Sequence, residues 1–341
     1  MENTNVTVSV VIPILNEKKY IRGLLDSLLC QDYDKSRLEI ILVDGNSQDN
    51  TVGIINEYIQ KYGVFKLYKN PQRTVQHALN IGMRAASGKY IVRMDAHATY
   101  ADDYISKCVE YLEKTDAVNV GGPMIAQGKT PVQRAVAAAY HSPFALGGGK
   151  FHIEGYEGYA DTVFLGAFKK ETMEELDYYD PNLPRSEDDD LNFRIQEKGY
   201  KVYITPEIKS VYYPRSSYKA LFKQYFEYGE WKVAVIKKHH RPARLSHLVP
   251  CAFVLFLVLG LIACALVQGL AGGIAGKAVC GLYAGILLLY LVIDAAASFT
   301  NKRLDTFGGK LRLFWIHIIL HIAYGCGFIK GLFRFRKFPQ A

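Results

Sequence analysis

The stretches VSVVIPILNE at residues 8–17 and LEIILVDGNSQDNT at residues 38–51 decide the fold of this chain. Each is a continuous apolar run that ends abruptly in polar and turn-forming residues, which is typical of a strand buried on both faces of a sheet. Between them, apolar residues recur at helical spacing from Ile21 to Leu29. The order strand, helix, strand predicts two neighbouring parallel strands joined by a crossover helix.

The same alternation continues along the first part of the chain. Asp49 can cap a second helix, and a strand at 64–68, a helix at 74–88 and a strand at 89–94 follow. We therefore predict an α/β domain on a doubly wound, mainly parallel sheet, with its ligand crevice at the carboxyl ends of the strands. Residues 141–160 are rich in Gly and aromatic residues and lack periodicity, so we expect a long loop there, either a lid or a plain connection.

Charge is distributed unevenly along the 341 residues. Residues 247–341 hold nine Lys and Arg but only two acidic residues, a net of +7 out of +8 for the whole chain. These cations flank apolar runs as membrane-interface anchors do, so we expect no nucleic-acid binding. The six cysteines include no CxxC pair, which argues against a disulfide scaffold or zinc site. Residues 6–14 resemble a strand and not a signal peptide, which predicts a cytoplasmic N-terminal domain.

The C-terminal part contains long apolar segments. Residues 248–270 and 278–293 are uncharged and approach the roughly 20 residues that a spanning helix requires. A third segment, 313–333, is apolar but contains two His and one Lys. Three spans would place the basic cluster at 334–337 outside the cell, whereas a re-entrant or interfacial third segment would keep every basic cluster inside, and both alternatives stay open. We expect a multi-pass protein of the inner (plasma) membrane.

Residues 216–239 interleave aromatic residues with lysines. This pattern suits a helix in the membrane interface, although an ordinary amphipathic helix explains it equally well. Gln224 and Trp231 lie in this segment, whose aromatic surface can stack on a sugar. We predict three parts: a catalytic domain at 1–214, an interfacial helix region at 215–246 and a membrane domain at 247–341.

Acidic residues follow two of the predicted strands. Asp44 ends the second strand, where its carboxylate can accept a hydrogen bond from a nucleobase N–H, although Asp-Gly is also ordinary turn chemistry. Asp95 and His97 come directly after a buried strand and can face the same side of an extended chain. A pyrophosphate needs a divalent cation to neutralise it, so this pair is a candidate Mg²⁺ or Mn²⁺ site, with a polar turn as the alternative.

A run of four acidic residues, 187–190, opens a predicted helix. The helix dipole and capping favour acidic residues at this position, which is the simplest explanation. Four in succession exceed what a cap needs, however, and their mutual repulsion can raise a pKa into the range of a general base.

The order of these motifs resembles that of family 2 inverting glycosyltransferases, which have the GT-A fold. VSVVIPILNE resembles the opening strand and turn of that family, and VDGNSQDNT at 43–51 resembles its nucleotide-binding turn. Residues 87–95 resemble the strand that leads to the metal motif, and the acidic run resembles the "ED" motif. The segment YGEWK at 228–232 and the apolar tail resemble in particular the succinoglycan-type exopolysaccharide glucosyltransferases.

The resemblance implies roles for the residues around the donor. Asp44 would contact the nucleotide base, a uracil, with Pro13 and Glu17 lining the same pocket. Asp95 would contact the ribose or the metal ion. His97 stands where many relatives have the second Asp of a DxD motif, and imidazole is also a competent metal ligand.

The resemblance also implies residues for the transfer step. Asp188 matches the catalytic base, with Glu187 beside it. Gln224 and Trp231 match the Q-x-x-R-W element of processive synthases only loosely, so we expect addition of a single sugar and not processive synthesis. These two residues are the candidates for contact with the acceptor at the membrane interface.

The function implied is transfer of a sugar, glucose from UDP-glucose, to a lipid-linked saccharide in exopolysaccharide biosynthesis, with Mg²⁺ or Mn²⁺ as cofactor and membrane lipids as surroundings. Arg73 and Lys89 lie near predicted strand ends and are further candidates to contact phosphate. Transfer directly onto a polyprenyl phosphate is an alternative. A sugar nucleotidyltransferase would need a Gly-rich loop after the first strand, which is lacking here, and a non-catalytic scaffold would have no use for the acidic residues. The sequence does not specify the oligomeric state.

Overall fold

The computed structural model describes residues 6–242, 244–270 and 273–337, and the chain divides into two compact units. Unit 1 comprises Met1–Ile125 and Lys150–Tyr213, and unit 2 comprises Ala126–Gly149 and Pro214–Ala341. The boundary between the two units thus falls at Tyr213 and Pro214, and residues 126–149 belong to unit 2. The division into a catalytic domain, an interfacial region and a membrane domain stays a prediction.

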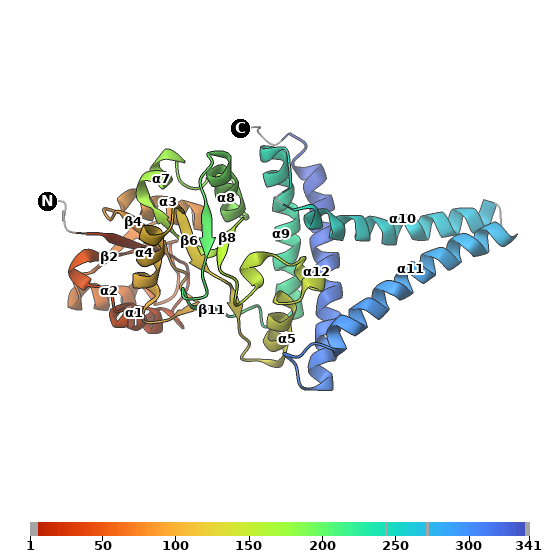
Figure 1. Ribbon diagram of the computed structural model, residues 1–341, viewed down its shortest axis with the longest axis horizontal. Coiled ribbons are helices and arrows are strands. Elements are labelled where there is room, and N and C mark those ends of the chain that lie inside the picture. Colours follow the sequence, from red (N-terminus) through yellow and green to blue (C-terminus); the bar gives the residue numbers. More distant parts are fainter. Residues whose placement is uncertain (1–5, 243, 271–272, 338–341) are drawn as a thin grey trace. The chain divides into compact units, whose positions relative to one another are not determined.

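The main sheet of unit 1 has the strand order β3-β2-β1-β4-β9-β6-β10-β8 (Figure 1). The strands β3, β2, β1 and β4 are mutually parallel, as predicted, whereas β9 runs antiparallel to both of its neighbours, β4 and β6. The sheet is therefore mixed in its second half. The strands are β1 (Val8–Ile14), β2 (Leu38–Asp44), β3 (Phe65–Lys69), β4 (Tyr90–Arg93), β6 (Asn119–Gly122), β8 (Gly158–Ala160), β9 (Phe164–Lys169) and β10 (Val202–Ile204).

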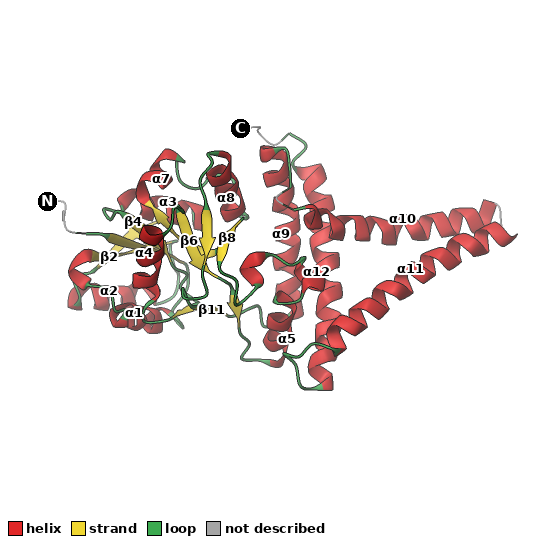
Figure 2. Ribbon diagram, in the orientation of Figure 1, coloured by secondary structure: helices red, strands yellow, loops and turns green. Residues whose placement is uncertain are grey.

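Helices cover both faces of this sheet (Figure 2), because successive side chains of a buried strand point to opposite faces. Val8, Val10 and Ile12 of β1 belong to one apolar core, and Val11 belongs to the other. The first core is completed by α1 (Ile21–Cys30), α2 (Thr51–Lys61) and α4 (Tyr104–Lys114), and the second by α3 (Val75–Ala85), α7 (Lys170–Glu175) and α8 (Glu187–Glu197).

Three local features predicted from the sequence are the cap of α2, the end of α3 and a long loop at 141–160. Asp49 accepts a hydrogen bond from the backbone N–H of Thr51 at 3.0 Å, so it serves the start of α2, although Asn50 is the cap residue. Helix α3 ends at Ala85 and not at Gly88, because Ala86 is extended. The long loop predicted at 141–160 is wrong in part: the segment contains α6 (Pro143–Leu146), η2 (Lys150–His152) and β8. Elements this short show no periodicity in the sequence.

Smaller elements complete unit 1. β5 (Thr99–Tyr100) pairs antiparallel with β11 (Ser210–Tyr212), and the short η1 (Lys35–Arg37) leads into β2. β7 (Ile125–Ala126) lies at the boundary between the two units.

Unit 2 is helical. In Figure 1, α12 runs alongside α9, while α10 and α11 extend away from α12 and meet towards their joined ends. Gly229 of α9 and Gly327 of α12 permit close packing, because a Cβ at either would overlap a carbonyl oxygen of the facing helix. Besides the short α6, the helices are α5 (Pro131–Tyr140), α9 (Tyr218–His239), η3 (Leu245–Leu248), α10 (Val249–Leu270), α11 (Gly273–Phe299) and α12 (Phe307–Arg334).

In the described part of the chain, three helical segments are long and apolar enough to cross a membrane: Leu245–Leu270, Gly273–Phe299 and Phe307–Arg334. They correspond to the three apolar segments recognised in the sequence. The most apolar windows of the first two are mostly exposed, with 11% and 6% buried, whereas 44% of the corresponding window of the third is buried.

Candidate active site

The carboxylate of Asp44 is fixed at the carboxyl edge of the sheet. It is the last residue of β2 and is buried, and it accepts hydrogen bonds from the Ser47 hydroxyl at 2.6 Å and the Ser47 backbone N–H at 3.1 Å. The backbone N–H of Gly45 donates to the carbonyl of Ile14 at 2.7 Å, which joins this turn to the end of β1. The turn therefore holds a hydrogen-bond acceptor beside the loop that follows β1.

The loops after β1 and β2 form one cross-linked edge. The Asn16 backbone N–H donates to the Ser47 hydroxyl at 2.8 Å, and the Asn16 side-chain oxygen accepts from the Gln48 N–H at 2.8 Å. Asn16 and Asn46 both have left-handed backbone angles, with φ of 58° and 62°, which Asn tolerates better than most residues. Sequence reasoning missed Asn16 and Ser47, although an Asn two residues after a buried strand was the available signal.

Pro13, Glu17 and Arg73 also reach this edge. Pro13 lies within β1 opposite Val43, and Glu17 follows that strand. Arg73 is exposed, has a left-handed φ of 62°, and its Cα lies 3.5 Å from the position that a Cβ on Gly45 would occupy. The Arg73 turn is thus beside the Asp44 turn. Lys89 is different, because it precedes β4 and so lies at the opposite edge of the parallel strands; its proposed phosphate contact is wrong.

Asp95 and His97 follow β4, which is paired with β1. A tight turn holds them: the Asp95 N–H donates to the Tyr100 hydroxyl at 2.6 Å, and that hydroxyl donates to the Asp95 carbonyl at 3.1 Å. The side chains of Asp95 and His97 are 25% and 44% exposed, so both are accessible to a ligand. His97 Nδ1 lies 3.5 Å from a Glu17 carboxylate oxygen. The loops after β1 and β4 therefore meet, and Tyr100 is a supporting residue that the sequence did not reveal.

These side chains fit a cation that is shared with a substrate. Among residues 6–242, 244–270 and 273–337, no group of three His, Cys, Asp or Glu side chains is arranged to hold a metal ion. Asp95 and His97 supply two accessible ligand atoms. Mg²⁺ is commonly bound through one or two carboxylates together with substrate phosphates, and Asp95 offers one such carboxylate.

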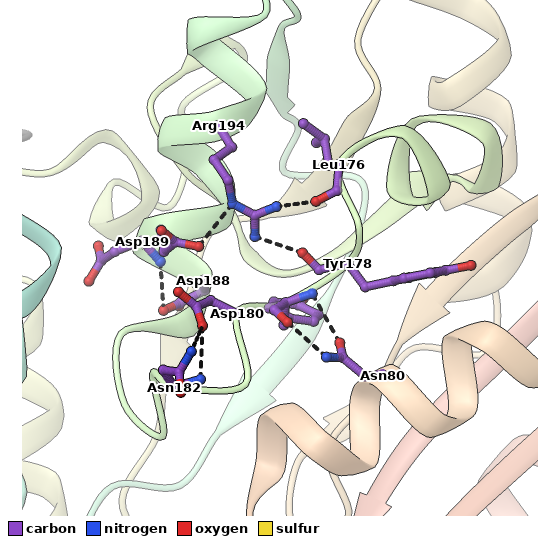
Figure 3. A network of polar contacts seen from close by, with 10 residues as sticks. Asn80, Leu176, Tyr178, Asp180, Asn182, Asp188, Asp189 and Arg194 are labelled. Carbon is purple, nitrogen blue, oxygen red and sulfur yellow. Dashed lines mark hydrogen bonds and ion pairs between the residues drawn. The ribbon is translucent and has the colours of Figure 1, made fainter. Parts of the chain in front are cut away.

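The four acidic residues at the start of α8 have different surroundings. Asp190 is fully buried and accepts a hydrogen bond from Arg194 Nε at 2.9 Å. Arg194 also donates to the carbonyls of Leu176 and Tyr178, so this pair attaches α8 to the preceding loop (Figure 3). Asp190 is therefore a structural residue.

Glu187 and Asp188 face different environments. The Glu187 side chain is 9% exposed, and one carboxylate oxygen lies 3.4 Å from Arg93 at the end of β4. Asp188 is exposed, and its Oδ1 accepts from the Asp189 N–H at 2.9 Å (Figure 3). Ser186, immediately before them, has a left-handed φ of 59°. Strained backbone of this kind is concentrated at functional sites, and here it occurs at the residue that precedes the first turn of α8.

The Glu187 carboxyl has a strongly altered pKa. Burial and, secondly, the charge of Asp188 raise its pKa, the Arg93 guanidinium opposes the rise, and the net change is from 4.5 to about 7. A carboxyl group with a pKa near neutrality at a ligand-accessible edge is typical of a functional site.

This raised pKa predicts a pH-dependent stability difference for Glu187→Gln. Below about pH 4.5 the carboxyl is protonated in both the folded and unfolded states, so it imposes no penalty. Stability is lost as the pH rises from about 4.5 to about 7, and above that the buried charge costs about 3 kcal/mol. Thermal unfolding in detergent should therefore show a higher Tm for Glu187→Gln than for wild type at pH 8, and nearly equal values at pH 5. Arg93 keeps Asp95 as a counter-charge in this variant.

The control for that experiment is Asp189→Asn, which alters a less buried neighbour in the same run. A Tm difference for Glu187→Gln that stayed constant from pH 5 to pH 8 would contradict the raised pKa.

Gln224 and Trp231 lie on α9 in unit 2. Gln224 Nε2 donates to the Tyr228 hydroxyl at 2.9 Å, within the same helix. The Trp231 ring centre is 4.9 Å from that of Phe335, and the Arg334 guanidinium lies 4.9 Å from the Trp231 ring centre. These contacts give Trp231 a packing role at the end of α12.

Comparison with known proteins identifies the family. The profile of glycosyl transferase family 2 matches residues 9–176. The succinoglycan biosynthesis protein ExoA of Rhizobium meliloti (strain 1021) is 30% identical over 253 residues, which cover 74% of this chain and 76% of that protein. The chain belongs to glycosyltransferase family 2. The predicted resemblance is confirmed at this level.

Two further comparisons cover nearly the whole chain. The dolichyl N-acetyl-alpha-D-glucosaminyl phosphate 3-beta-D-2,3-diacetamido-2,3-dideoxy-beta-D-glucuronosyltransferase of Methanococcus voltae is 28% identical over 333 residues, covering 95% of this chain and 98% of that protein. A mannosyltransferase from Pyrobaculum calidifontis, solved in complex with GDP-Man and Mn²⁺, superposes with a TM-score of 0.63 at 20% identity, covering 96% of this chain and 87% of that one. The expected GT-A-like fold is thereby confirmed.

The family 2 match covers only part of the candidate site. Residues 9–176 include Asp44, Asp95 and His97 but end before the acidic run. The inclusion of Glu187 and Asp188 depends on geometry, namely the contact between Glu187 and Arg93 at the end of β4.

Proposed function

We propose that this family 2 enzyme transfers one sugar from a nucleoside diphosphate to a lipid-linked saccharide, with inversion at the anomeric carbon. The observation that carries the proposal is the convergence of acidic groups on one edge of the sheet. Asp44 ends β2, Asp95 follows β4, and Arg93 connects Asp95 to Glu187 at the start of α8. An edge of this kind can bind the base and diphosphate of a donor and still present a carboxylate to an acceptor.

We assign some of these residues to binding of the nucleotide sugar and others to removal of the acceptor proton. Asp44 accepts from the nucleobase, in a pocket bordered by Pro13 and Glu17, and Arg73 lies on the adjacent turn to oppose phosphate charge. Asp188 accepts the proton of the attacking hydroxyl, because it is exposed at the start of α8 whereas Glu187 is buried against Arg93. Developing negative charge on the leaving diphosphate needs a positive partner.

Asp95 and His97 would hold a divalent cation together with the diphosphate. Mg²⁺ or Mn²⁺ bound there supplies positive charge to the leaving group. The Glu17 carboxylate, 3.5 Å from His97 Nδ1, orients the imidazole.

The acceptor is proposed to be a saccharide on a lipid carrier. The name of the Methanococcus voltae relative describes transfer to a dolichyl-phosphate-linked sugar, which supports a lipid-linked saccharide over a bare polyprenyl phosphate. Glucose from UDP-glucose and a role in exopolysaccharide synthesis remain our proposal for donor and pathway, in keeping with similarity to a succinoglycan biosynthesis protein.

Turnover of the purified protein in detergent or lipid tests the proposal. UDP-glucose, UDP-GlcNAc and GDP-Man would each be supplied with polyprenyl phosphate or with a polyprenyl-diphosphate saccharide, and products would be resolved by mass spectrometry. We expect transfer from a UDP-sugar to the saccharide-bearing lipid. Sugar–phosphate linkage to the bare polyprenyl phosphate would favour the alternative enzyme class, and no transfer from any donor would refute the proposed function.

We further propose that α10 and α11 span the inner membrane while α12 lies in its cytoplasmic interface with α9. Only 11% and 6% of the most apolar windows of the first two spans are buried, as expected for lipid-facing helices, compared with 44% for α12. α12 also pairs its charges with α9: Lys330 and Arg334 contact the buried Glu230 at 3.0 and 2.8 Å. This arrangement keeps the basic clusters inside, in agreement with the positive-inside rule.

Epitope tags test this topology. One tag would follow Lys302, between α11 and α12, and another would follow the C-terminus. Both are expected to be cleaved by protease in inside-out membrane vesicles and protected in right-side-out vesicles. Protection of the C-terminal tag alone in inside-out vesicles would instead mean that α12 spans the membrane.

A further inference from the structure

Arg93 is a buried cation between two carboxylates from separate parts of the fold. Its side chain is 9% exposed. One terminal nitrogen lies 3.4 Å from Glu187 Oε1, and Nε lies 3.7 Å from Asp95 Oδ1. Its guanidinium carbon is also 5.9 Å from the centre of the Tyr179 ring. Arg93 was not among the residues expected from the sequence.

This arrangement is costly unless it serves a purpose beyond stability. Removing charges from water carries a desolvation penalty that an ion pair often fails to recover, so a buried ion pair is weak support for a purely stabilising role. Arg93 Nε, moreover, has no hydrogen-bond partner within the part of the chain that the structure describes. A well-packed apolar side chain would avoid both costs.

Attachment of α8 does not depend on Arg93. Asp190 and Arg194 already connect α8 to the carbonyls of Leu176 and Tyr178. Asn192 of the same helix accepts a hydrogen bond from Asn119 at 3.0 Å. Other contacts therefore hold α8 in place, and the contact between Arg93 and Glu187 is not needed to attach this helix.

Tyr179 provides a rigid surface beside this guanidinium. Asn80 of α3 donates to the Tyr179 carbonyl at 2.7 Å and accepts from the Tyr179 N–H at 2.9 Å (Figure 3). The Tyr179 side chain is buried, so its ring limits where the guanidinium can move. Arg93 is thus held from three sides, by Tyr179, Asp95 and Glu187.

We propose that Arg93 is a positioning residue that couples the donor side of the site to the base side. This inference rests on the proposed function. The guanidinium holds the Asp95 carboxylate, which faces the donor diphosphate, and the Glu187 carboxylate, which precedes the base Asp188, at a fixed separation. A planar guanidinium can contact two carboxylates at once, whereas a Lys ammonium is a compact point charge on a flexible stem.

The test compares Arg93→Lys and Arg93→Met with Arg194→Lys, a matched change in the arginine that only anchors α8. Calorimetry with UDP and Mn²⁺ would measure the nucleotide affinity and, from the stoichiometry, the fraction of protein molecules that bind UDP. The kcat of each variant would then be expressed per UDP-binding (competent) molecule. For Arg93→Lys we expect kcat to fall by roughly 10- to 100-fold, as for a misplaced catalytic group, with UDP affinity within about tenfold. Arg194→Lys should lower Tm and leave kcat per competent molecule near that of wild type.

A double-mutant cycle identifies the partner. If Arg93 acts through Glu187, adding Glu187→Gln to Arg93→Met should change kcat by less than about threefold, although Glu187→Gln alone lowers it more. Full kcat per competent molecule in Arg93→Lys, or multiplicative effects in the cycle, would overturn the inference. If the wild type showed no turnover with any donor, the proposed function itself would be refuted. That outcome differs from a failure of the Arg93 inference alone, in which the wild type remains active.

Discussion

Replacing Asp188 with Asn is expected to lower kcat by roughly 10²- to 10⁴-fold while donor affinity stays within a few-fold, the pattern of a lost general base. The substitution keeps the shape of the side chain but removes the proton acceptor. A base is needed when the acceptor hydroxyl loses its proton and not when the donor binds. Steady-state kinetics together with UDP calorimetry separate the two effects.

The surroundings of the acidic run provide the controls. Asp189→Asn should keep turnover near that of wild type, and Asp190→Asn should lower Tm, because Asp190 holds Arg194 in the anchor of α8. Asp44→Ala should show the opposite pattern to Asp188→Asn, with nucleotide affinity reduced first. If Asp188→Asn kept wild-type turnover while Glu187→Gln abolished it, the base would be Glu187.

Removal of divalent cations should produce the second large effect. UDP affinity in EDTA is expected to fall by on the order of 10²-fold relative to Mn²⁺, because a metal ion contributes several kcal/mol to an otherwise uncompensated diphosphate. Asp95 lies only 3.7 Å from Arg93 and partly neutralises its charge, so Arg93 offers the diphosphate little free positive charge. Titration calorimetry with EDTA or Mn²⁺ measures the difference.

Uridine is the matched control ligand, because it has the base and ribose of UDP without the phosphates. Its affinity should be the same with EDTA or Mn²⁺. Asp95→Asn should remove most of the cation dependence for UDP. Equal UDP affinity of the wild type with and without cation would rule out the metal assignment.

The acidic run illustrates how far local sequence can lead. Four successive carboxylates at a helix start suggested a pKa raised by mutual repulsion, and the pKa of Glu187 is raised to about 7, by burial first and by the charge of Asp188 second. The residues could not be told apart from the sequence, because their differences arise from partners far away in the chain. Glu187 meets Arg93 from β4, and Asp190 meets Arg194, which in turn binds the carbonyls of residues 176 and 178.

Lys89 directly precedes β4, and the parallel order that the sequence predicted already places the start of this strand at the edge away from the candidate site. Residues 126–149 show a limit like that of the acidic run. They follow directly on the α/β alternation, yet they belong to unit 2, where α5 packs against α12. A helix partner so distant in the chain is not encoded in a local pattern.

The sequence by itself determined the alternation of strands and helices up to β4, the positions of Asp44 and Asp95 at strand ends, and the apolar C-terminal segments. These features follow from periodicity and from abrupt polar ends, which act over a few residues. Only the tertiary structure decided the antiparallel insertion of β9, the burial of α12 against α9 and the central place of Arg93. Arg93 and Glu187 are 94 residues apart, and a contact of that range depends on how the whole chain packs.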